Sequence, residues 1–415
     1  MATPTSPVAE RIVDADGHVL EHPTAMQAYM PARYRAQGFH VTPGEAGREV
    51  LHFRGKTMNA NLLALAGTGG LSLADRERAG RGELKYTEVK PGAFHPKERL
   101  AEMATDAIQQ AVVYPTLFLG LSGFDDPDFA EAQGDAYNRW LADFCGHAPT
   151  RLFGIAALVQ TDLDRAVRMA TRAKELGLVG VFLRPNHNVD GVFLCDPSYD
   201  RLWAALQDLD LSVGFHPYLV PDMPGACRDL GLGRFVAPGA KSLVGSGGDE
   251  SLVMGNGGIS NIFFTQALAN VYDMHTTIAM LACGGVLERF PRLRCIFLEA
   301  NGGWIVPWLE RLDHHHEIFP WDVPQMKLRP SEYFKRQCWI SFDPDESTLR
   351  FTAESPLVGA DRIIWASDYP HPDARIPGVV DELRAAMAGL PDHAQRRILG
   401  LNAVDLYGLP EPVAH

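Results

Sequence analysis

The stretch Arg11-Ile12-Val13-Asp14-Ala15-Asp16-Gly17-His18 joins an apolar run to polar side chains at its carboxyl end. Side chains alternate between the two faces of a β-strand, so Asp14, Asp16 and His18 are expected on one face. In a (β/α)8 barrel the carboxyl ends of the strands form the face that carries the chemistry. The stretch therefore predicts a first barrel strand that supplies two or three candidate metal ligands.

Seven further short apolar runs follow, and segments with helical periodicity, such as residues 164–176 and 200–209, separate them. Alternating strands and helices predict an α/β fold with a parallel sheet, either an open doubly wound sheet or a barrel. Because the count of eight closes a barrel and polar residues end several strands, we favour a (β/α)8 TIM barrel. The further strands are expected at residues 108–114, 152–159, 179–183, 211–215, 295–298, 339–342 and 362–366.

Two long segments interrupt the alternation and predict insertions after the first and fifth strands. Residues 22–95 are irregular, contain a predicted hairpin at 49–56, and are a candidate lid. Residues 217–260 are rich in Gly and Pro and are too long for an ordinary loop between a strand and a helix. We expect residues 1–415 to form a single metal-dependent catalytic domain, with both insertions placed over the site or in a subunit contact.

The composition of the chain argues against two classes of binding partner, nucleic acids and membranes. A formal net charge of −13 provides no basic surface for nucleic acid or for an anionic membrane. The first residues lack the apolar core of a signal peptide, and we find no apolar stretch of about 20 residues that spans a bilayer. The six cysteines form no C-x-x-C pair and predict reduced thiols. We therefore expect a cytoplasmic protein that acts on a small organic molecule, with a homodimer left open.

Two more residues with metal-binding side chains end predicted strands. His216 follows the run at 211–215, and Asp368 follows the run at 362–366. An aspartate buried at a strand end is costly unless a cation or hydrogen bonds compensate it. Together with Asp16 and His18, these residues predict a divalent metal site with mixed nitrogen and oxygen ligands.

Four stretches of the chain match motifs of one family: Val13-Asp14-Ala15-Asp16-Gly17-His18-Val19-Leu20-Glu21, Phe215-His216, Leu298-Glu299-Ala300-Asn301-Gly302-Gly303-Trp304 and Ala366-Ser367-Asp368-Tyr369-Pro370-His371. In these stretches the chain resembles the amidohydrolase-related proteins of the amidohydrolase superfamily. The resemblance implies a distorted (β/α)8 barrel and a divalent metal held by Asp16, His18, His216 and Asp368. It also implies a metal-dependent enzyme, since the family includes hydrolases and non-oxidative decarboxylases.

One position departs from the family pattern. Relatives usually carry a histidine after the sixth strand, whereas this chain has Asn301 there. The strand ends instead in Glu299, and His275 begins the amphipathic stretch that leads into it. Both are further candidate metal ligands, and they make the ligand set rich in carboxylates. Such a set suits iron or manganese at least as well as zinc, and bridging carboxylates are typical of di-iron and di-manganese sites.

The carboxylate-rich pattern also resembles a branch of the superfamily that includes dinuclear non-heme iron monooxygenases. We therefore predict O₂-dependent hydroxylation of a small organic metabolite at two irons, which requires an electron donor. The first alternative is a mononuclear zinc or manganese hydrolase or non-oxidative decarboxylase. The second is a non-catalytic partner subunit that the metal stabilises.

Other residues are expected to support the chemistry. Asp368 and His371 are the candidate catalytic pair, and Glu21 is expected to orient the His18 ring as an acceptor. Arg184 follows the fourth strand, where it either clamps a substrate carboxylate or pairs with an acid. Asn301 is a candidate substrate contact.

Each of these assignments has a structural alternative. For Glu299, the alternative to metal binding is a buried carboxylate that accepts hydrogen bonds from a neighbouring backbone or Arg side chain. For His275, the alternative is a ring that caps or packs against its own helix. The run His314-His315-His316 is interpreted as a solvated helix end, although it has the composition of a metal-binding tract. Asp343 is interpreted as a helix N-cap.

Overall fold

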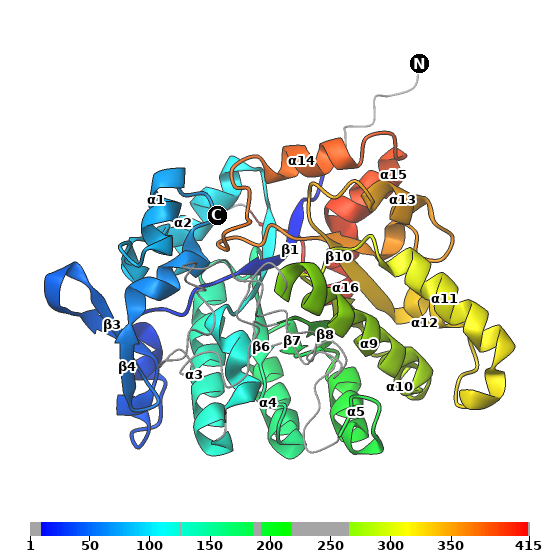
Figure 1. Cartoon of the computed structure of the whole chain (residues 1–415), viewed down its shortest axis with the longest axis horizontal. Coiled ribbons are helices and arrows are strands. Elements are labelled where there is room, and N and C mark those ends of the chain that lie inside the picture. The colour runs from blue at the N-terminus through cyan, green and yellow to red at the C-terminus, as the bar shows by residue number, and fades with distance from the viewer. Residues whose placement is uncertain (1–9, 125, 186–191, 218–264, 414–415) are drawn as a thin grey trace, which may run out of the picture.

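A computed structural model describes residues 10–124, 126–185, 192–217 and 265–413 of the chain (Figure 1). Eight strands form one parallel sheet, in which neighbours in space are also neighbours in chain order. They are β1 (Val13–His18), β5 (Gln110–Tyr114), β6 (Leu152–Ala157), β7 (Gly180–Leu183), β8 (Ser212–Phe215), β9 (Cys295–Phe297), β10 (Cys338–Phe342) and β11 (Ile363–Trp365).

The two ends of this sheet meet, so the sheet is a nearly closed barrel. The backbone N–H of Asp368, just after β11, donates to the carbonyl oxygen of Asp16 in β1 over 3.2 Å, and His18 N–H donates to Tyr369 O over 2.7 Å. The TIM-barrel prediction is confirmed, with each observed strand overlapping a predicted run, and the doubly wound alternative is wrong. The same closure places Asp368 beside the carboxyl end of β1.

Helices surround the barrel (Figure 1). The predicted helical segments 164–176 and 200–209 correspond to α4 and α5. The helices are α1 (Leu73–Gly80), α2 (Pro96–Thr105), α3 (Pro127–Gly146), α4 (Leu163–Glu175), α5 (Asp200–Asp208), α9 (Asn270–Cys283), α10 (Val286–Arg289), α11 (Ile305–Ile318), α12 (Pro330–Gln337), α13 (Leu349–Glu354), α14 (Val379–Ala386), α15 (Asp392–Arg396) and α16 (Asn402–Tyr407).

The predicted hairpin in the segment after β1 is part of a small antiparallel sheet. Its strands are β2 (His40–Pro43), β3 (Glu49–Phe53) and β4 (Lys56–Asn59), in that order. Arg54 and Gly55 connect β3 to β4 with φ values of +52° and +73°. Positive φ at both positions is the requirement of a tight two-residue hairpin turn, and glycine meets it without steric cost. The predicted insertion after the fifth strand, residues 217–260, lies outside the described residues except for Pro217.

A shift of register in β1 separates Asp14 from the other polar residues of that strand. The pairing with β5 is irregular between Asp14 and Gly17, as at a β-bulge. Asp14 therefore accepts hydrogen bonds from Ser367, at 3.0 Å from its N–H and 2.6 Å from its hydroxyl. Strict alternation predicted one face for Asp14, Asp16 and His18, and this is wrong for Asp14. Its carboxylate joins β1 to the segment after β11 instead.

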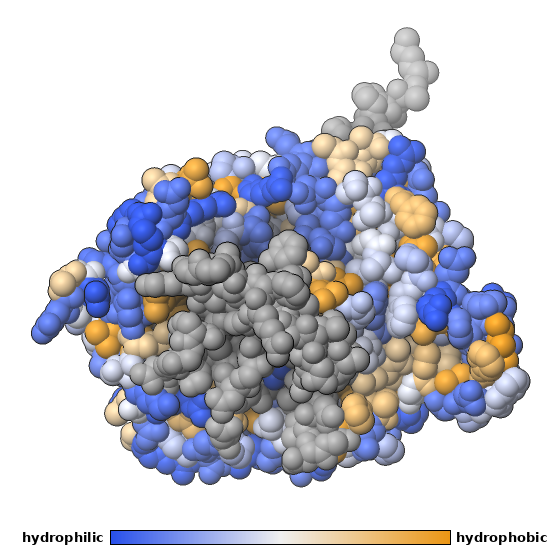
Figure 2. All heavy atoms as spheres, in the orientation of Figure 1, coloured by the Kyte–Doolittle hydropathy of each residue, from blue (hydrophilic) through white to orange (hydrophobic). Residues whose placement is uncertain are grey.

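The surface, the helices and the cysteines of the described residues can be compared with the predicted partners and redox state. Among the described residues on the face drawn in Figure 2, hydrophilic surface is interrupted by apolar patches, one of them where α11 ends, and Ile318, Phe319 and Trp321 are exposed there. None of the described helices combines the length and apolar character that crossing a bilayer requires. The cysteines of the described residues are free, and three of them are buried, as predicted for reduced thiols: Cys145, Cys295 and Cys338.

Candidate metal centre

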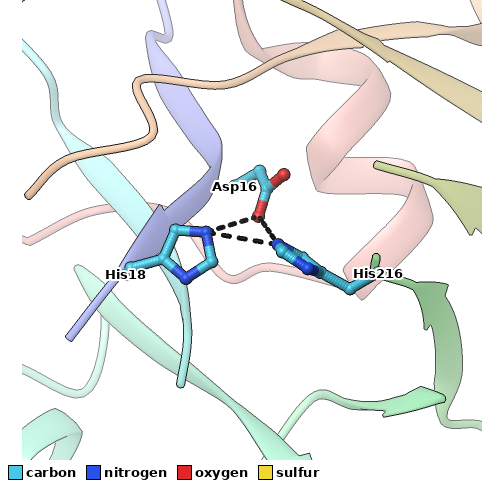
Figure 3. Close-up of side chains that lie close together, drawn as sticks. All are labelled: Asp16, His18 and His216. Atoms are coloured by element: carbon cyan, nitrogen blue, oxygen red, sulfur yellow. Dashed lines mark hydrogen bonds and ion pairs between the residues drawn. The ribbon is translucent and has the colours of Figure 1, made fainter. Parts of the chain in front are cut away.

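Two strands bring three of the predicted ligands together. Asp16 and His18 stand at the carboxyl end of β1, and His216 directly follows β8. His18 Nε2 lies 3.3 Å from His216 Nε2 and 3.6 Å from Asp16 Oδ1, and His216 Nε2 lies 3.9 Å from the same oxygen. Figure 3 shows both rings converging on the Asp16 carboxylate. All three side chains are buried, so the group is held in one arrangement.

Hydrogen bonds to carbonyl groups fix the proton positions on both rings. His18 Nδ1 lies 2.8 Å from Pro115 O, and His216 Nδ1 lies 2.8 Å from Pro217 O. A carbonyl oxygen only accepts, so each Nδ1 carries the proton and donates it. Burial lowers the pKa of both rings well below the usual value, which keeps them neutral. Both Nε2 atoms therefore present lone pairs to one another.

The Asp16 carboxylate adds a third electron-rich atom to this arrangement. Its Oδ1 is buried and has no hydrogen-bond partner among the described residues. Burial, followed by the neighbouring carboxylates of Asp368 and Glu299, raises the pKa of Asp16 well above its usual value. A buried acceptor that faces two imidazole lone pairs is unfavourable without a cation. The donor set fits a divalent metal ion, because two imidazole nitrogens and a buried carboxylate oxygen converge on one point and a cation there would take the place of the proton that the raised pKa of Asp16 otherwise retains.

Asp368 is the fourth candidate ligand. It comes from the turn after β11, which contacts β1 where the barrel closes. Its Oδ1 lies 3.2 Å from His18 Nε2, and its Oδ2 is buried without a hydrogen-bond partner among the described residues. His18, Asp368 and His371 form a second close grouping of possible metal ligands, which shares His18 with the first. The four residues predicted as ligands from the strand ends are thus brought together.

His371 is bonded to Asp368 and is not aimed at the histidine pair. Its Nδ1 lies 2.8 Å from Asp368 Oδ1, and its ring stacks on the His18 ring with centroids 4.0 Å apart. Burial by itself lowers the pKa of His371, but the adjacent Asp368 carboxylate outweighs it and raises the pKa to about 9. His371 therefore donates from Nδ1 to the Asp368 carboxylate beside the other candidate ligands, and a catalytic role of the two residues stays a prediction.

A cavity of about 370 Å³ opens beside Asp368. Glu299, Asp343 and Asp373 line it together with Asn301. Glu299, Asp368 and Asp373 offer oxygens within 4.8 Å of one another, and Glu299 Oε2 also lies 3.5 Å from His216 Nδ1. Burial and the Asp368 carboxylate raise the pKa of Glu299 well above its usual value. The cavity is the space available to a small substrate next to the ligand set.

Three residues of this cavity have left-handed backbone conformations. The φ values are +44° at Glu299, +54° at Asn301 and +54° at Asp368. Such conformations are disfavoured for residues with a Cβ, least so for Asn and Asp, and they cluster at functional sites. The turns after β9 and β11 therefore direct polar side chains to the mouth of the barrel at a conformational cost of about 1–3 kcal/mol each.

His275 lies apart from the other predicted ligands. It belongs to α9, where its ring stacks on Trp308 at 4.7 Å and meets Trp304 edge-on at 4.5 Å. None of the close groupings of possible ligands in the described residues includes it. Burial lowers the pKa of His275 to about 4, so the ring is neutral. The packing alternative describes its surroundings, and ligation of a metal by His275 stays a prediction.

Glu21 acts on the backbone behind His18 and does not accept from its ring. The ring's acceptor is Pro115 O, which corrects the expected contact. The Glu21 carboxylate accepts from the backbone N–H groups of Thr116, Leu117 and Phe118 at 2.9–3.1 Å. Burial raises the pKa of Glu21 to about 7 against these hydrogen bonds. Its support of His18 is therefore indirect, through the segment that follows β5.

Two other predicted residues also lie at the carboxyl end of the barrel. Arg184 directly follows β7, is 8% exposed, and its backbone N–H donates to Gln160 Oε1 over 2.9 Å. Asn301 Nδ2 donates to Asp343 Oδ2 over 2.8 Å at the cavity wall. Contact of either side chain with a substrate stays a prediction.

Three residues near this site were not predicted from the sequence or were predicted in another role. Asp343 was expected as an N-cap, but α13 begins later, with Thr348 as its N-cap, and Asp343 lines the cavity. Burial and the neighbouring Glu346 raise the pKa of Asp343 to about 8. Asp373 and Thr116 carried no signal, although the stretch Asp368-Tyr369-Pro370-His371-Pro372-Asp373 holds three polar residues close together. The run 314–316 does lie at the end of α11, as predicted.

The chain matches one family model and several characterised proteins. The family model described as amidohydrolase matches residues 13–409. A 2-amino-3-carboxymuconate-6-semialdehyde decarboxylase from Dictyostelium discoideum is 24% identical over 84% of this chain and 88% of its own length. A gamma-resorcylate decarboxylase from Rhodococcus jostii is 26% identical over 56% of this chain and 64% of its own.

Solved structures share the fold at low sequence identity. An amidohydrolase from Mycobacterium avium subsp. paratuberculosis superposes with a TM-score of 0.71 at 21% identity, over 97% of this chain and 99% of that one. A 5-carboxyvanillate decarboxylase from Sphingomonas paucimobilis gives 0.61 at 20% identity, over 97% and 100%. A dihydroxybenzoic acid decarboxylase from Polaromonas, solved with bound manganese, gives 0.61 at 18% identity, over 98% and 100%.

These relatives favour one of the predicted alternatives over the main prediction. The monooxygenase branch finds no support in them, since four of the five are named as decarboxylases and the fifth as an amidohydrolase. The family match covers the strands and the turns that carry Asp16, His18, His216 and Asp368. The chain is an enzyme of the amidohydrolase superfamily and belongs to the amidohydrolase-related family.

Proposed function

We propose that the protein is a divalent-metal-dependent, non-oxidative decarboxylase of a small aromatic or conjugated carboxylic acid. The observation that carries the proposal is the hydrogen bond between His371 and Asp368 at the wall of a cavity, directly beside a buried ligand set. Relatives that decarboxylate carboxymuconate semialdehyde and resorcylate support the choice of reaction and the substrate class. This is the alternative of the sequence analysis, and it replaces hydroxylation as our preferred function.

Asp16, His18, His216 and Asp368 would hold the metal ion. When bound, the ion would act as a Lewis acid that polarises the substrate's oxygen atoms and orients its carboxylate. Manganese or zinc suits two imidazole nitrogens and two carboxylates. The manganese in the structure of the dihydroxybenzoic acid decarboxylase supports manganese in particular.

The chain's own residues handle the proton that the reaction needs. Loss of CO₂ breaks the bond between the carboxylate and the ring or chain carbon, leaves the electron pair on that carbon, and requires one proton there. Asp368 lines the cavity, and its Oδ1 lies 2.8 Å from His371 Nδ1. We assign His371 as the source of the proton, which reaches the carbon by way of its contact with Asp368, with solvent restoring the proton after each turnover.

The volume of the cavity limits the size of the substrate that it can hold. Its volume of about 370 Å³ suits a single small molecule, and the low exposure of Asp368 keeps bulk water from the proton donor. Exclusion of water strengthens the electrostatic interactions between the residues at the reacting carbon and the substrate.

The test is a screen of manganese-loaded and zinc-loaded protein against carboxyl-labelled aromatic and conjugated acids, including gamma-resorcylate and 5-carboxyvanillate. We expect one labelled CO₂ per product, and one deuterium in the product when the solvent is D₂O. Asp368→Asn and His371→Gln should each lower kcat by about 100-fold or more. His314→Gln on the exposed side of α11 is the matched control and should leave kcat unchanged. Release of an alcohol or amine without CO₂ would instead identify a hydrolase.

A further inference from the structure

A second cavity lies beside the cavity already described. Its volume is about 490 Å³, against about 370 Å³ for the first, and we call the two the outer and the inner cavity. The outer cavity lies between residues 70–76, at the start of α1, and residues 372–382. Asp373, Arg375 and Glu382 belong to the walls of both cavities. The two cavities therefore adjoin at these three side chains.

Arg375 forms a bridge at the place where the cavities adjoin. Its Nη2 lies 2.6 Å from Asp345 Oδ2, and its Nη1 lies 3.2 Å from Glu382 Oε1. Asp345 lies in the turn after β10, and Glu382 lies in the first turn of α14. One guanidinium group thus ties two separate elements together, because its fork of N–H groups reaches both carboxylates at once.

The bridge consists of ion pairs that are in contact with solvent. The side chains of Arg375, Asp345 and Glu382 are 58%, 46% and 37% exposed. Ion pairs of this kind contribute little net stability, and salt weakens them further. Thermal motion therefore breaks and re-forms the bridge readily, and the long Arg375 side chain can swing aside while the elements that it joins stay folded.

The backbone that carries Arg375 is held at both ends. It belongs to the segment between β11 and α14, drawn in orange in Figure 1. Near the start of this segment, Gly69 N–H donates to Pro370 O over 2.9 Å, and at its end Gly378 N–H donates to Asp106 Oδ1 over 2.6 Å. Movement at the junction of the cavities is therefore expected of the Arg375 side chain and not of the segment.

Arg375 is also the one basic side chain in the wall of the inner cavity, within the part of the chain that the structure describes. An acid enters most readily where a positive charge offsets the carboxylates around it. The path past Arg375 is therefore the electrostatically favoured one for a carboxylic acid. The acidic side chains of that wall are Glu299, Asp343, Asp345, Asp368, Asp373 and Glu382.

We propose that Arg375 is a gate and a specificity-determining residue. The substrate enters the inner cavity from the outer cavity when the two ion pairs open, and their closure sets the length of acid that the inner cavity holds. The identity of the substrate as an acid rests on the proposed decarboxylation. Without the guanidinium, the two cavities join, and a longer acid extends past the position of Arg375 into the outer cavity.

Extraction of zinc from the zinc-loaded protein by 1,10-phenanthroline tests the gate without a substrate. This chelator is neutral, so its approach does not depend on the charge of the cavity. We expect Arg375→Ala to raise the second-order rate constant of extraction by about 10-fold or more. Higher salt should raise the rate constant in the natural protein but not in Arg375→Ala.

Arg384→Ala is the matched control for this measurement. Arg384 also lies on the surface in an ion pair, with Glu10, and it lines neither cavity. We expect its rate constant and its salt dependence to equal those of the natural protein. Equal rate constants in Arg375→Ala and Arg384→Ala would overturn the gate.

A pair of acids tests the role in specificity. We expect Arg375→Ala to raise kcat/KM for an aromatic acid that carries a second ring, relative to the single-ring acid, by about 10-fold or more. Arg384→Ala should keep the ratio of the natural protein. An unchanged ratio in Arg375→Ala would contradict the role in specificity. Absence of CO₂ release from every acid would instead count against the proposed function, and zinc extraction would still decide the gate.

Discussion

The Nε2 atoms of His18 and His216 lie 3.3 Å apart although both rings carry their proton on Nδ1. Two lone pairs thus face each other in a buried site, with the unpartnered Oδ1 of Asp16 beside them. A shared divalent cation converts this repulsion into coordination. The relationship explains why the barrel gathers acceptors without donors at the carboxyl ends of β1 and β8.

Asp14 and Asp16 provide a matched pair of substitutions on one strand. Asp16→Asn removes a charged ligand and should lower metal affinity by at least about 10-fold. Asp14→Asn alters the hydrogen bonds to Ser367 at the barrel seam, so it should lower the free energy of unfolding by about 1–3 kcal/mol while metal affinity is retained. Metal titration and urea denaturation of both variants measure the two effects. Loss of metal in Asp14→Asn alone would contradict the assignment.

The number of metal ions tests the mononuclear account against the predicted dinuclear iron site. Elemental analysis of the natural protein, Glu299→Gln and His275→Ala should give one ion per chain in each case. Neither residue is among the four proposed ligands, and His275 packs between Trp304 and Trp308. A content of two ions that falls to one in either variant would support the dinuclear alternative instead.

Glu21 predicts a dependence of stability on pH. Burial raises the pKa of Glu21 in the folded protein from its ordinary value of 4.5 to about 7, so the folded state binds this proton more tightly than the unfolded state. The stabilisation is full below pH 4.5 and is lost as pH rises through about 7. The difference between the two pKa values corresponds to about 3 kcal/mol. In urea denaturation between pH 4.5 and 7.5, Glu21→Gln should remove this slope, whatever its constant offset.

Gly302 predicts a steric effect next to the cavity. A Cβ at this position would lie 2.0 Å from Cε2 of the Phe342 ring, so Gly302→Ala must displace the turn that holds Asn301. We expect a loss of about 1–3 kcal/mol in the free energy of unfolding and a lower kcat. Gly80→Ala is the control, because a Cβ there meets no atom within 4 Å. Similar melting temperatures for both variants would contradict the close packing at Gly302.

The sequence predicted the barrel because each strand is a local pattern. The apolar runs and the polar residues that end them identify Asp16, His18, His216 and Asp368 without any knowledge of packing. The same local pattern gave the wrong strand face for Asp14, because the shift of register at the β-bulge depends on the pairing of β1 with β5. It also failed for Asp343, because a turn of irregular length separates it from α13.

Contacts between residues that are far apart in the chain could not be predicted from the sequence. Thr116 meets His371 across 255 positions of the chain, and only closure of the barrel brings them together. The acceptor of the His18 ring likewise depends on the path of the chain after β5, which places Pro115 O there in place of Glu21. Left-handed turns at Glu299, Asn301 and Asp368 carry no glycine signal in the sequence, although they direct the cavity's polar side chains.

The most direct test of the central claim is the release of CO₂ under strictly anaerobic conditions by protein loaded with one equivalent of manganese or zinc. The account predicts CO₂ release at the same rate with and without O₂, together with loss of activity after chelation and recovery when the metal is returned. Consumption of O₂ with formation of a hydroxylated product, and no CO₂ release in its absence, would contradict it.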